Sequence, residues 1–278
     1  YNDYMHLYSL LFLLLLILIL LSILYYIYQT PCIYEPFYSQ FSVAPQGLFI
    51  TGTMRSGSSL MGNIIYESGI DLFGKYKPLQ FSASNKKEHN SNGYYCLEKI
   101  NRLDGKLFEN VGINWMGDTS KISNVPKWYS NEVKTIVTEM NKYKPWGLKS
   151  VSFCKTIKFW IQMVNYPVLI VTFRHPDAVL QSMKNKSGSN SNIGKYYWEN
   201  CYKNILSLQI PIIYVYYDDF IKNPFKVYSM ICNKLEERKI KIKKMTENEL
   251  NNIVKPSKRN YIPKNKMSTS QQQIWNIL

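Results

Sequence analysis

Nine residues that follow a short apolar run have the composition of a phosphate-binding loop. The run is 47–50, and the loop extends from Thr51 to Ser59 with the sequence TGTMRSGSS. A glycine-containing loop between a strand and a helix wraps backbone N–H groups around a phosphate, and the helix N-terminus adds its positive end. A nucleoside triphosphatase carries Lys where this chain has Ser58, and the cation here is Arg55, inside the loop. The loop therefore indicates a phosphate site that differs from a Walker A loop.

A second group of residues has the chemistry of another phosphate site. Arg174 follows the apolar run 167–173, and Ser182 comes eight residues later on a predicted helix over 177–185. Arginine offers two parallel N–H donors to a phosphate, and a helix-borne hydroxyl adds a further donor. Alone, each motif could be an ordinary turn or strand end. Two of them, in this order and about 120 residues apart, predict two phosphate sites in a βαβ context.

Together the motifs resemble those of sulfotransferases that use 3′-phosphoadenosine 5′-phosphosulfate (PAPS). Thr51–Leu60 is similar to the 5′-phosphosulfate loop of carbohydrate-type and bacterial members, and cytosolic members carry Lys at the position of Arg55. The resemblance implies that Arg55 is the catalytic cation at the bridging oxygen. It further implies donor contacts from two groups, the loop residues Thr53, Arg55, Ser56, Gly57, Ser58 and Ser59, and the 3′-phosphate residues Arg174, Ser182, Lys258 and Arg259.

Looser similarity covers much of the chain between 47 and 259. Trp146–Lys149 resembles the start of a Lys-Asp-Pro-Arg segment, although serines and valine replace its remainder. Tyr216–Phe220 is similar to the family's Tyr-Glu-Asp-Leu strand end. Asp218 and Asp219 in that segment are expected to cap the strand, and His175 is expected to fix the turn after Arg174.

Sulfuryl transfer also needs a base that deprotonates the acceptor. The candidates are Glu88, His89, Glu98 and Asp104, and Glu98 is preferred because it lies nearest the family's acidic position. A salt bridge on a helix surface is an equally good interpretation of Glu98. The scheme requires no metal. Five cysteines without a C-x-x-C pair argue against a zinc site and leave disulfide pairing open.

Apolar runs alternate with helical patterns over 47–278, and this order predicts the fold. The runs 47–50, 167–173 and 212–217 are expected to be buried strands. Buried strands that alternate with helices indicate an α/β domain, with a P-loop-like parallel sheet and helices on both faces. Residues 187–192 are of low complexity and are expected to form a loop.

The N-terminal part of the chain predicts a membrane anchor. Residues 10–28 are apolar except for Ser22, and a helix of that length spans about 28 Å, close to the hydrocarbon thickness of a bilayer. A cleaved signal peptide would have a basic start and a shorter run. We therefore expect a tail at 1–9, a single-pass helix at 10–28 and a stem at 29–46. Such a layout is similar to Golgi enzymes that sulfate glycans, which makes a glycan the expected acceptor and the lumen the expected compartment if the source is eukaryotic.

The formal net charge of +15 suits a polyanionic ligand. Thirteen Lys and Arg but only four Asp and Glu lie in 222–266, without the interleaved aromatic residues of a nucleic-acid surface. No nucleic-acid partner is therefore expected. Two alternatives stay open: a nucleotide or small-molecule kinase on the same kind of loop, and a non-catalytic membrane protein that binds anions.

Overall fold

The structure is a computed structural model, and it describes residues 16, 18–22, 47–80, 93–122, 124–187, 191–254 and 266–278. The chain divides into two units, Tyr1–Val43 and Ala44–Leu278. In the first unit, Leu16 and 18–22 are helical. Most of the predicted anchor and the whole predicted stem lie outside the described residues. Within the described ranges, no helix has both the length and the apolar character needed to cross a membrane.

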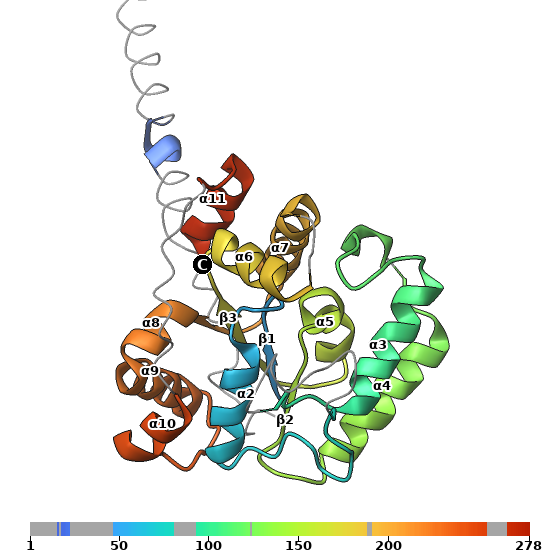
Figure 1. Cartoon of the computed structure of the whole chain (residues 1–278), viewed down its shortest axis with the longest axis vertical. Coiled ribbons are helices and arrows are strands. Elements are labelled where there is room, and N and C mark those ends of the chain that lie inside the picture. The colour runs from blue at the N-terminus through green and yellow to red at the C-terminus, as the bar shows by residue number, and fades with distance from the viewer. Residues whose placement is uncertain are drawn as a thin grey trace, which may run out of the picture. The chain divides into compact units, whose positions relative to one another are not determined.

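A parallel sheet of four strands organises the second unit (Figure 1). The strand order is β2-β1-β3-β4, and every neighbouring pair is parallel. The strands are β1 Gly47–Thr51, β2 Gly147–Lys149, β3 Pro167–Phe173 and β4 Ile212–Tyr216. The three predicted strands are confirmed. The short β2 was not predicted, because three residues are too few for a recognisable apolar pattern.

Helices connect these strands and confirm the predicted α/β alternation. They are α2 Ser58–Glu67, α3 Glu98–Asn110, α4 Lys127–Met140, α5 Phe153–Ile161, α6 Pro176–Ser187, α7 Ser191–Leu206, α8 Tyr217–Lys222, α9 Pro224–Glu237, α10 Glu247–Ile253 and α11 Thr269–Ile277, with a 3-10 turn, η3, at Thr119–Lys121. The loop expected at 187–192 is wrong at its two ends, since Ser187 belongs to α6 and 191–192 belong to α7; residues 188–190 lie outside the described residues.

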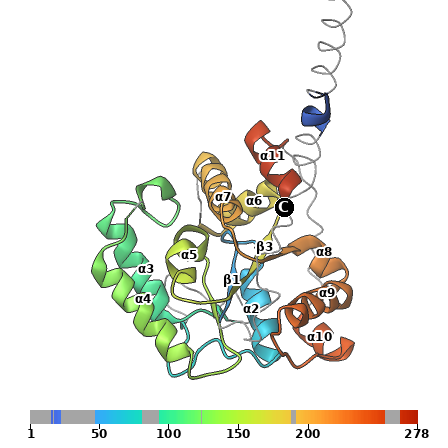
Figure 2. The ribbon, with the colours of Figure 1, turned by 180° about the vertical axis from the view of Figure 1, so that it is seen from behind.

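Helices cover both faces of the sheet, as predicted, and each face has its own hydrophobic core. Successive residues of a strand point to opposite faces, so Phe49 belongs to the core with α3, α4, α5 and α7. Leu48 and Ile50 belong to the core with α2, α9 and α10. Figures 1 and 2 show these helices around the sheet from two sides. The chain runs from β1 to β2 on one side and then to β3 on the other, and ligands of parallel α/β sheets bind at the carboxyl ends of strands where the strand order switches in this way, here β1 and β3.

Candidate functional site

The loop after β1, Thr51–Ser59, is called the phosphate loop below, and it bends sharply at two glycines. Gly52 and Gly57 have φ angles of +153° and +95°. A Cβ atom at Gly52 would overlap the backbone of Thr172 on β3, and one at Gly57 would overlap the ring of Tyr217. Between them, Arg55 has a φ of +68°, a left-handed conformation that disfavours a residue with a side chain. Strain of this kind is concentrated at functional sites.

Hydrogen bonds inside the phosphate loop fix its shape. The hydroxyl of Ser56 donates to the carbonyl of Thr53 at 2.7 Å, and the amide of Ser56 donates to the same carbonyl at 3.2 Å. Ser58 and Ser59 begin α2, whose first N–H groups have no acceptor within the helix. The first turn of α2 has no acidic residue, so its positive end suits an anion.

Lys149, at the carboxyl end of β2, adds a buried cation beside the loop. Its Nζ atom donates to the Oγ atom of Ser59 at 3.0 Å and to the carbonyl of Tyr94 at 2.9 Å. Only 3% of Lys149 is exposed, and burial lowers its pKa to about 8. Burying a cation is costly unless a partner compensates. The position of Lys149 therefore favours a negatively charged ligand at Ser59.

The two predicted phosphate motifs meet directly. The Nε atom of Arg55 donates to the Oγ atom of Ser182 on α6 at 3.0 Å. Burial lowers the pKa of Arg55, and the nearby charge of Arg174 lowers it further. The positive charges of the two guanidinium groups repel each other, and an anion that contacts both would relieve this repulsion. The structure thus places Arg55, Ser182 and Arg174 in one positively charged site at the carboxyl ends of β1 and β3.

Arg174 is held by residues at the end of β4. Its Nε atom lies 3.1 Å from an Oδ atom of Asp218 in an ion pair, and its guanidinium lies 4.8 Å from the ring centre of Tyr217. Asp218 therefore orients Arg174, a more specific role than the strand cap that was predicted. The Nδ1 atom of His175 accepts the amide of Asp177 at 3.2 Å, so His175 does form part of the turn into α6.

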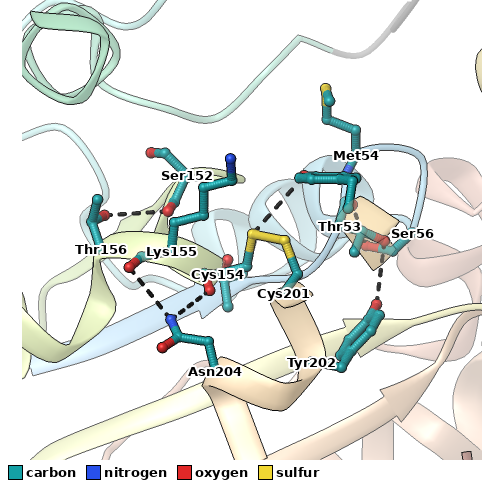
Figure 3. Close-up of a disulfide and its surroundings, with 12 residues drawn as sticks. Thr53, Met54, Ser56, Ser152, Cys154, Lys155, Thr156, Cys201, Tyr202 and Asn204 are labelled. Atoms are coloured by element: carbon teal, nitrogen blue, oxygen red, sulfur yellow. Dashed lines mark hydrogen bonds between the residues drawn. A yellow bond between two sulfur atoms is a disulfide. The ribbon is translucent and has the colours of Figure 1, made fainter. Parts of the chain in front are cut away.

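Two tyrosines on α7 form hydrogen bonds with the phosphate loop. Tyr197 accepts a hydrogen bond from the amide of Met54 at 3.1 Å. The hydroxyl of Tyr202 lies 3.4 Å from that of Thr53 and donates to the carbonyl of Thr172 at 3.0 Å. Figure 3 shows Thr53, Met54 and Tyr202 close to a disulfide between α5 and α7. This disulfide joins Cys154 and Cys201; Cys96 and Cys232 are free and buried.

The candidates for the acceptor base lie in different environments. Glu98, at the start of α3, accepts a hydrogen bond from Arg102 at 2.6 Å, which is the surface salt bridge considered above. Asp104 is fully buried and accepts hydrogen bonds from Tyr129, Ser152 and Thr156. This makes Asp104 a structural carboxylate. Glu88 and His89 lie outside the described residues, as do Lys258 and Arg259 of the predicted 3′-phosphate site.

Sequence reasoning missed part of this site. Lys149 ends a segment, Trp146–Lys149, that resembles one in the family, yet its position beside Ser59 depends on the unpredicted strand β2. Tyr197 and Tyr202 look like core residues of an amphipathic helix, and no local signal relates them to a loop that is more than 140 residues away in the sequence. Across the described ranges, no group of three His, Cys, Asp or Glu side chains could hold a metal ion. The metal-free scheme stays a prediction.

The fold and the site define an α/β protein in which an arginine-containing loop between a strand and a helix lies at the carboxyl ends of parallel strands. Residues 45–239 match the model of the sulfotransferase family. The match covers more than half of the chain, and the chain therefore belongs to the sulfotransferase family. No protein among the curated sequences matches it.

Solved sulfotransferase structures are similar to the chain at low sequence identity. The sulfotransferase domain from the curacin biosynthetic pathway is 17% identical, with 83% of this chain and 96% of that chain covered and a TM-score of 0.42. Sulfotransferase STF1 from Mycobacterium tuberculosis H37Rv is 12% identical, with 77% of this chain and 72% of that chain covered and a TM-score of 0.42. Sulfotransferase STF9 from Mycobacterium avium is 14% identical, with 71% of this chain and 67% of that chain covered and a TM-score of 0.39.

Proposed function

We propose that this chain transfers a sulfuryl group from PAPS to a hydroxyl or amine, with a carbohydrate as the preferred acceptor. The observation that supports the donor is the hydrogen bond between Arg55 and Ser182, which joins the phosphate loop to the second motif. A nucleotide with phosphate groups at both its 5′ and 3′ positions offers one anion to the phosphate loop and another to Arg174. ATP lacks the second of these anions.

The residues of the site suit in-line transfer between two positioned oxygen atoms. Negative charge builds on the departing phosphate oxygen, and preorganised donors that face this charge lower the barrier. Arg55 is the proposed cation at that oxygen. The first amides of α2 and the cation Lys149, through Ser59, would hold the 5′-phosphate. Arg174, oriented by Asp218, would hold the 3′-phosphate, with Ser182, Lys258 and Arg259 as the other proposed donors.

Deprotonation of the acceptor and the location of the enzyme are further parts of the proposal. Glu98 is the proposed base, and its ion pair with Arg102 would have to open when the acceptor binds. The apolar segment 10–28 is proposed to anchor the enzyme in a membrane of the Golgi type, where glycans are available as acceptors.

The donor is tested by comparing the thermal stability of the protein with different nucleotides. At a concentration of 100 times Kd, a ligand adds about 2.7 kcal/mol, which raises Tm by about 5–10 °C for a domain of this size. Adenosine 3′,5′-bisphosphate should produce this shift and ATP with magnesium should not. The opposite result would favour a kinase.

The acceptor is tested by transfer of labelled sulfate from PAPS to a panel of glycans and lipids. Label in a glycan supports the carbohydrate class, and label only in a lipid contradicts it. Strong, salt-sensitive glycan binding without any transfer or bisphosphate binding would identify a non-catalytic anion-binding protein instead.

A further inference from the structure

The contacts of α7 with the phosphate loop go beyond packing. Tyr197 and Tyr202 are 2% and 0% exposed, so neither hydroxyl is exposed to solvent. A buried hydroxyl without a partner costs free energy, and a pair of buried hydrogen bonds fixes the groups that make it. Both hydroxyls bond to residues that directly precede Arg55: Tyr197 to the amide of Met54, and Tyr202 to the side chain of Thr53.

The directions of these bonds follow from the number of protons available. The hydroxyl of Tyr202 donates to the carbonyl of Thr172, so the hydroxyl of Thr53 must be the donor in their contact. Tyr202 thereby joins the phosphate loop to β3. The hydroxyl of Tyr197 accepts from Met54 and lies 3.9 Å from the sulfur of Cys154. A disulfide sulfur has no proton, so Tyr197 is the donor to Cys154.

The disulfide fixes the helix that presents both tyrosines. Cys201 lies on α7 between Tyr197 and Tyr202, and its partner Cys154 lies on α5. Asn204, one turn after Cys201, donates to the carbonyl of Cys154 at 2.8 Å (Figure 3). The disulfide therefore fixes the distance between α7 and α5 in the part of α7 that carries the two tyrosines.

We propose that Tyr197 and Tyr202 are positioning residues that hold Arg55 in its left-handed conformation, and that the Cys154–Cys201 disulfide fixes α7 so that they do. The consequence of this positioning rests on the proposed function: tight binding of the sulfate donor and fast sulfuryl transfer. Neither tyrosine contacts the donor in this scheme. Each acts through the backbone and side chain of the residues before Arg55.

The first test compares Tyr197→Phe and Tyr202→Phe with Tyr196→Phe, a matched control on the same helix. Tyr196 is 48% exposed, and the phenyl ring keeps the packing of each site. Loss of one hydrogen bond corresponds to about a 2- to 12-fold change in an equilibrium constant. We expect bisphosphate Kd to rise by that factor in the two loop variants and kcat to fall by at least as much. If both variants match Tyr196→Phe in Kd and kcat, the positioning role is wrong.

The second test does not depend on donor or activity. Hydrogen–deuterium exchange with mass spectrometry measures protection of a peptide containing Met54, whose amide bonds to Tyr197. In the absence of nucleotide, exchange of this peptide should be faster in Tyr197→Phe than in the wild type and unchanged in Tyr196→Phe. Equal exchange in all three proteins would overturn the proposal. If the wild type binds no bisphosphate but exchange still increases in Tyr197→Phe, the proposed function fails while the positioning of the loop is upheld.

The third test concerns the disulfide. Dithiothreitol transfers two electrons and two protons to Cys154 and Cys201, giving two thiols and the cyclic disulfide of the reagent. Reduction should increase exchange at Met54 and raise bisphosphate Kd severalfold. Cys201→Ser should show the same changes without reductant and should not respond to it. If reduction leaves exchange and Kd unchanged, the disulfide does not fix the loop.

Discussion

The Nε atom of Arg55 donates a hydrogen bond to the Oγ atom of Ser182 at 3.0 Å, although 127 positions separate the two residues in the sequence. They meet because β1 and β3 are parallel neighbours, and the segments that follow their carboxyl ends lie at the same edge of the sheet. Ser182, which belongs to the predicted 3′-phosphate motif, therefore also contacts the loop predicted to bind the 5′-phosphosulfate. A donor nucleotide that binds Arg55 must compete with this hydrogen bond. Substitution of Ser182 should therefore change the binding of both the 5′ and the 3′ phosphate groups of the nucleotide.

Replacing Arg55 by alanine or glycine should lower turnover equally, whereas the two variants should differ in folding stability. In Arg55→Ala and Arg55→Gly, kcat should fall by about 10²- to 10³-fold, because the charge that faces the departing oxygen is removed. Donor binding should survive in part through the α2 amides. Because the φ of Arg55 is +68°, the glycine variant should be more stable than the alanine variant by about 1 kcal/mol in urea unfolding. Unchanged turnover would exclude the catalytic role, and Lys106→Ala, at an exposed lysine, is the control.

Replacing Arg174 should affect one phosphate more than the other. Arg174→Ala should weaken binding of adenosine 3′,5′-bisphosphate by about 10- to 100-fold, the range expected for charge-assisted hydrogen bonds. Binding of 5′-AMP should change by less than about 3-fold, as measured by calorimetry. Asp218→Asn removes the ion pair that orients Arg174 and should give a smaller loss with the same selectivity. Asp219→Asn, at an exposed neighbour, should have no effect; equal losses for both nucleotides would refute the assignment.

The predictable parts of this protein were those in which neighbouring residues specify a local structure. Continuous apolar residues predicted β1 and β3, and the glycines and serines after β1 predicted a tight loop before a helix; its binding of phosphate stays a prediction. Arg174 and Ser182 were predictable because strand and helix spacing places both near one end of the sheet. The two hydrophobic cores followed from the alternation of strands with helices.

The parts that could not be predicted depend on contacts between distant segments. Lys149 became a candidate only when β2 placed it beside Ser59. Tyr197 and Tyr202 are core-like aromatic residues in sequence, and only the packing of α7 against α5 turns their hydroxyls toward the phosphate loop. The pairing of Cys154 with Cys201 has the same origin, because cysteine spacing alone does not determine connectivity.

The charge of Lys149 should make donor binding dependent on pH. Burial lowers its pKa from 10.5 to about 8, so the cation is lost as the pH rises through about 8. An anionic donor favours the charged form, and its affinity should therefore decrease above pH 8. The effect of pH on folding stability has the opposite sign. Between pH 8 and 10.5 the unfolded chain binds more protons at Lys149 than the folded chain, so the free energy of unfolding increases with pH. Lys149→Met should bind the bisphosphate more weakly at pH 7 and with a flatter pH profile; an unchanged profile would contradict this role.

The buried carboxylate Asp104 connects α3 to the segment after β2. It accepts hydrogen bonds from Tyr129 on α4 at 2.6 Å and from Ser152, which contacts Ser150 at 2.6 Å. The carbonyl of Ser150 in turn accepts the hydroxyl of Thr51 at 2.8 Å, so this polar network ends at the phosphate loop. Burial raises the pKa of Asp104 to about 6, although its three hydroxyl donors lower it.

This raised pKa predicts that stability decreases as the pH rises. Between pH 3.8 and 6 the folded chain binds more protons at Asp104 than the unfolded chain, so its contribution is complete below pH 3.8 and is lost through pH 6. The loss amounts to about 3 kcal/mol, since one pKa unit corresponds to about 1.4 kcal/mol. Asp104→Asn cannot ionise. The unfolding free energies of wild type and Asp104→Asn are measured in urea, and the stability of the wild type relative to the variant should fall by about 2 kcal/mol from pH 4 to pH 7, the part of the loss that lies in this range. A difference between wild type and Asp104→Asn that stays constant with pH would contradict the raised pKa of the buried carboxyl.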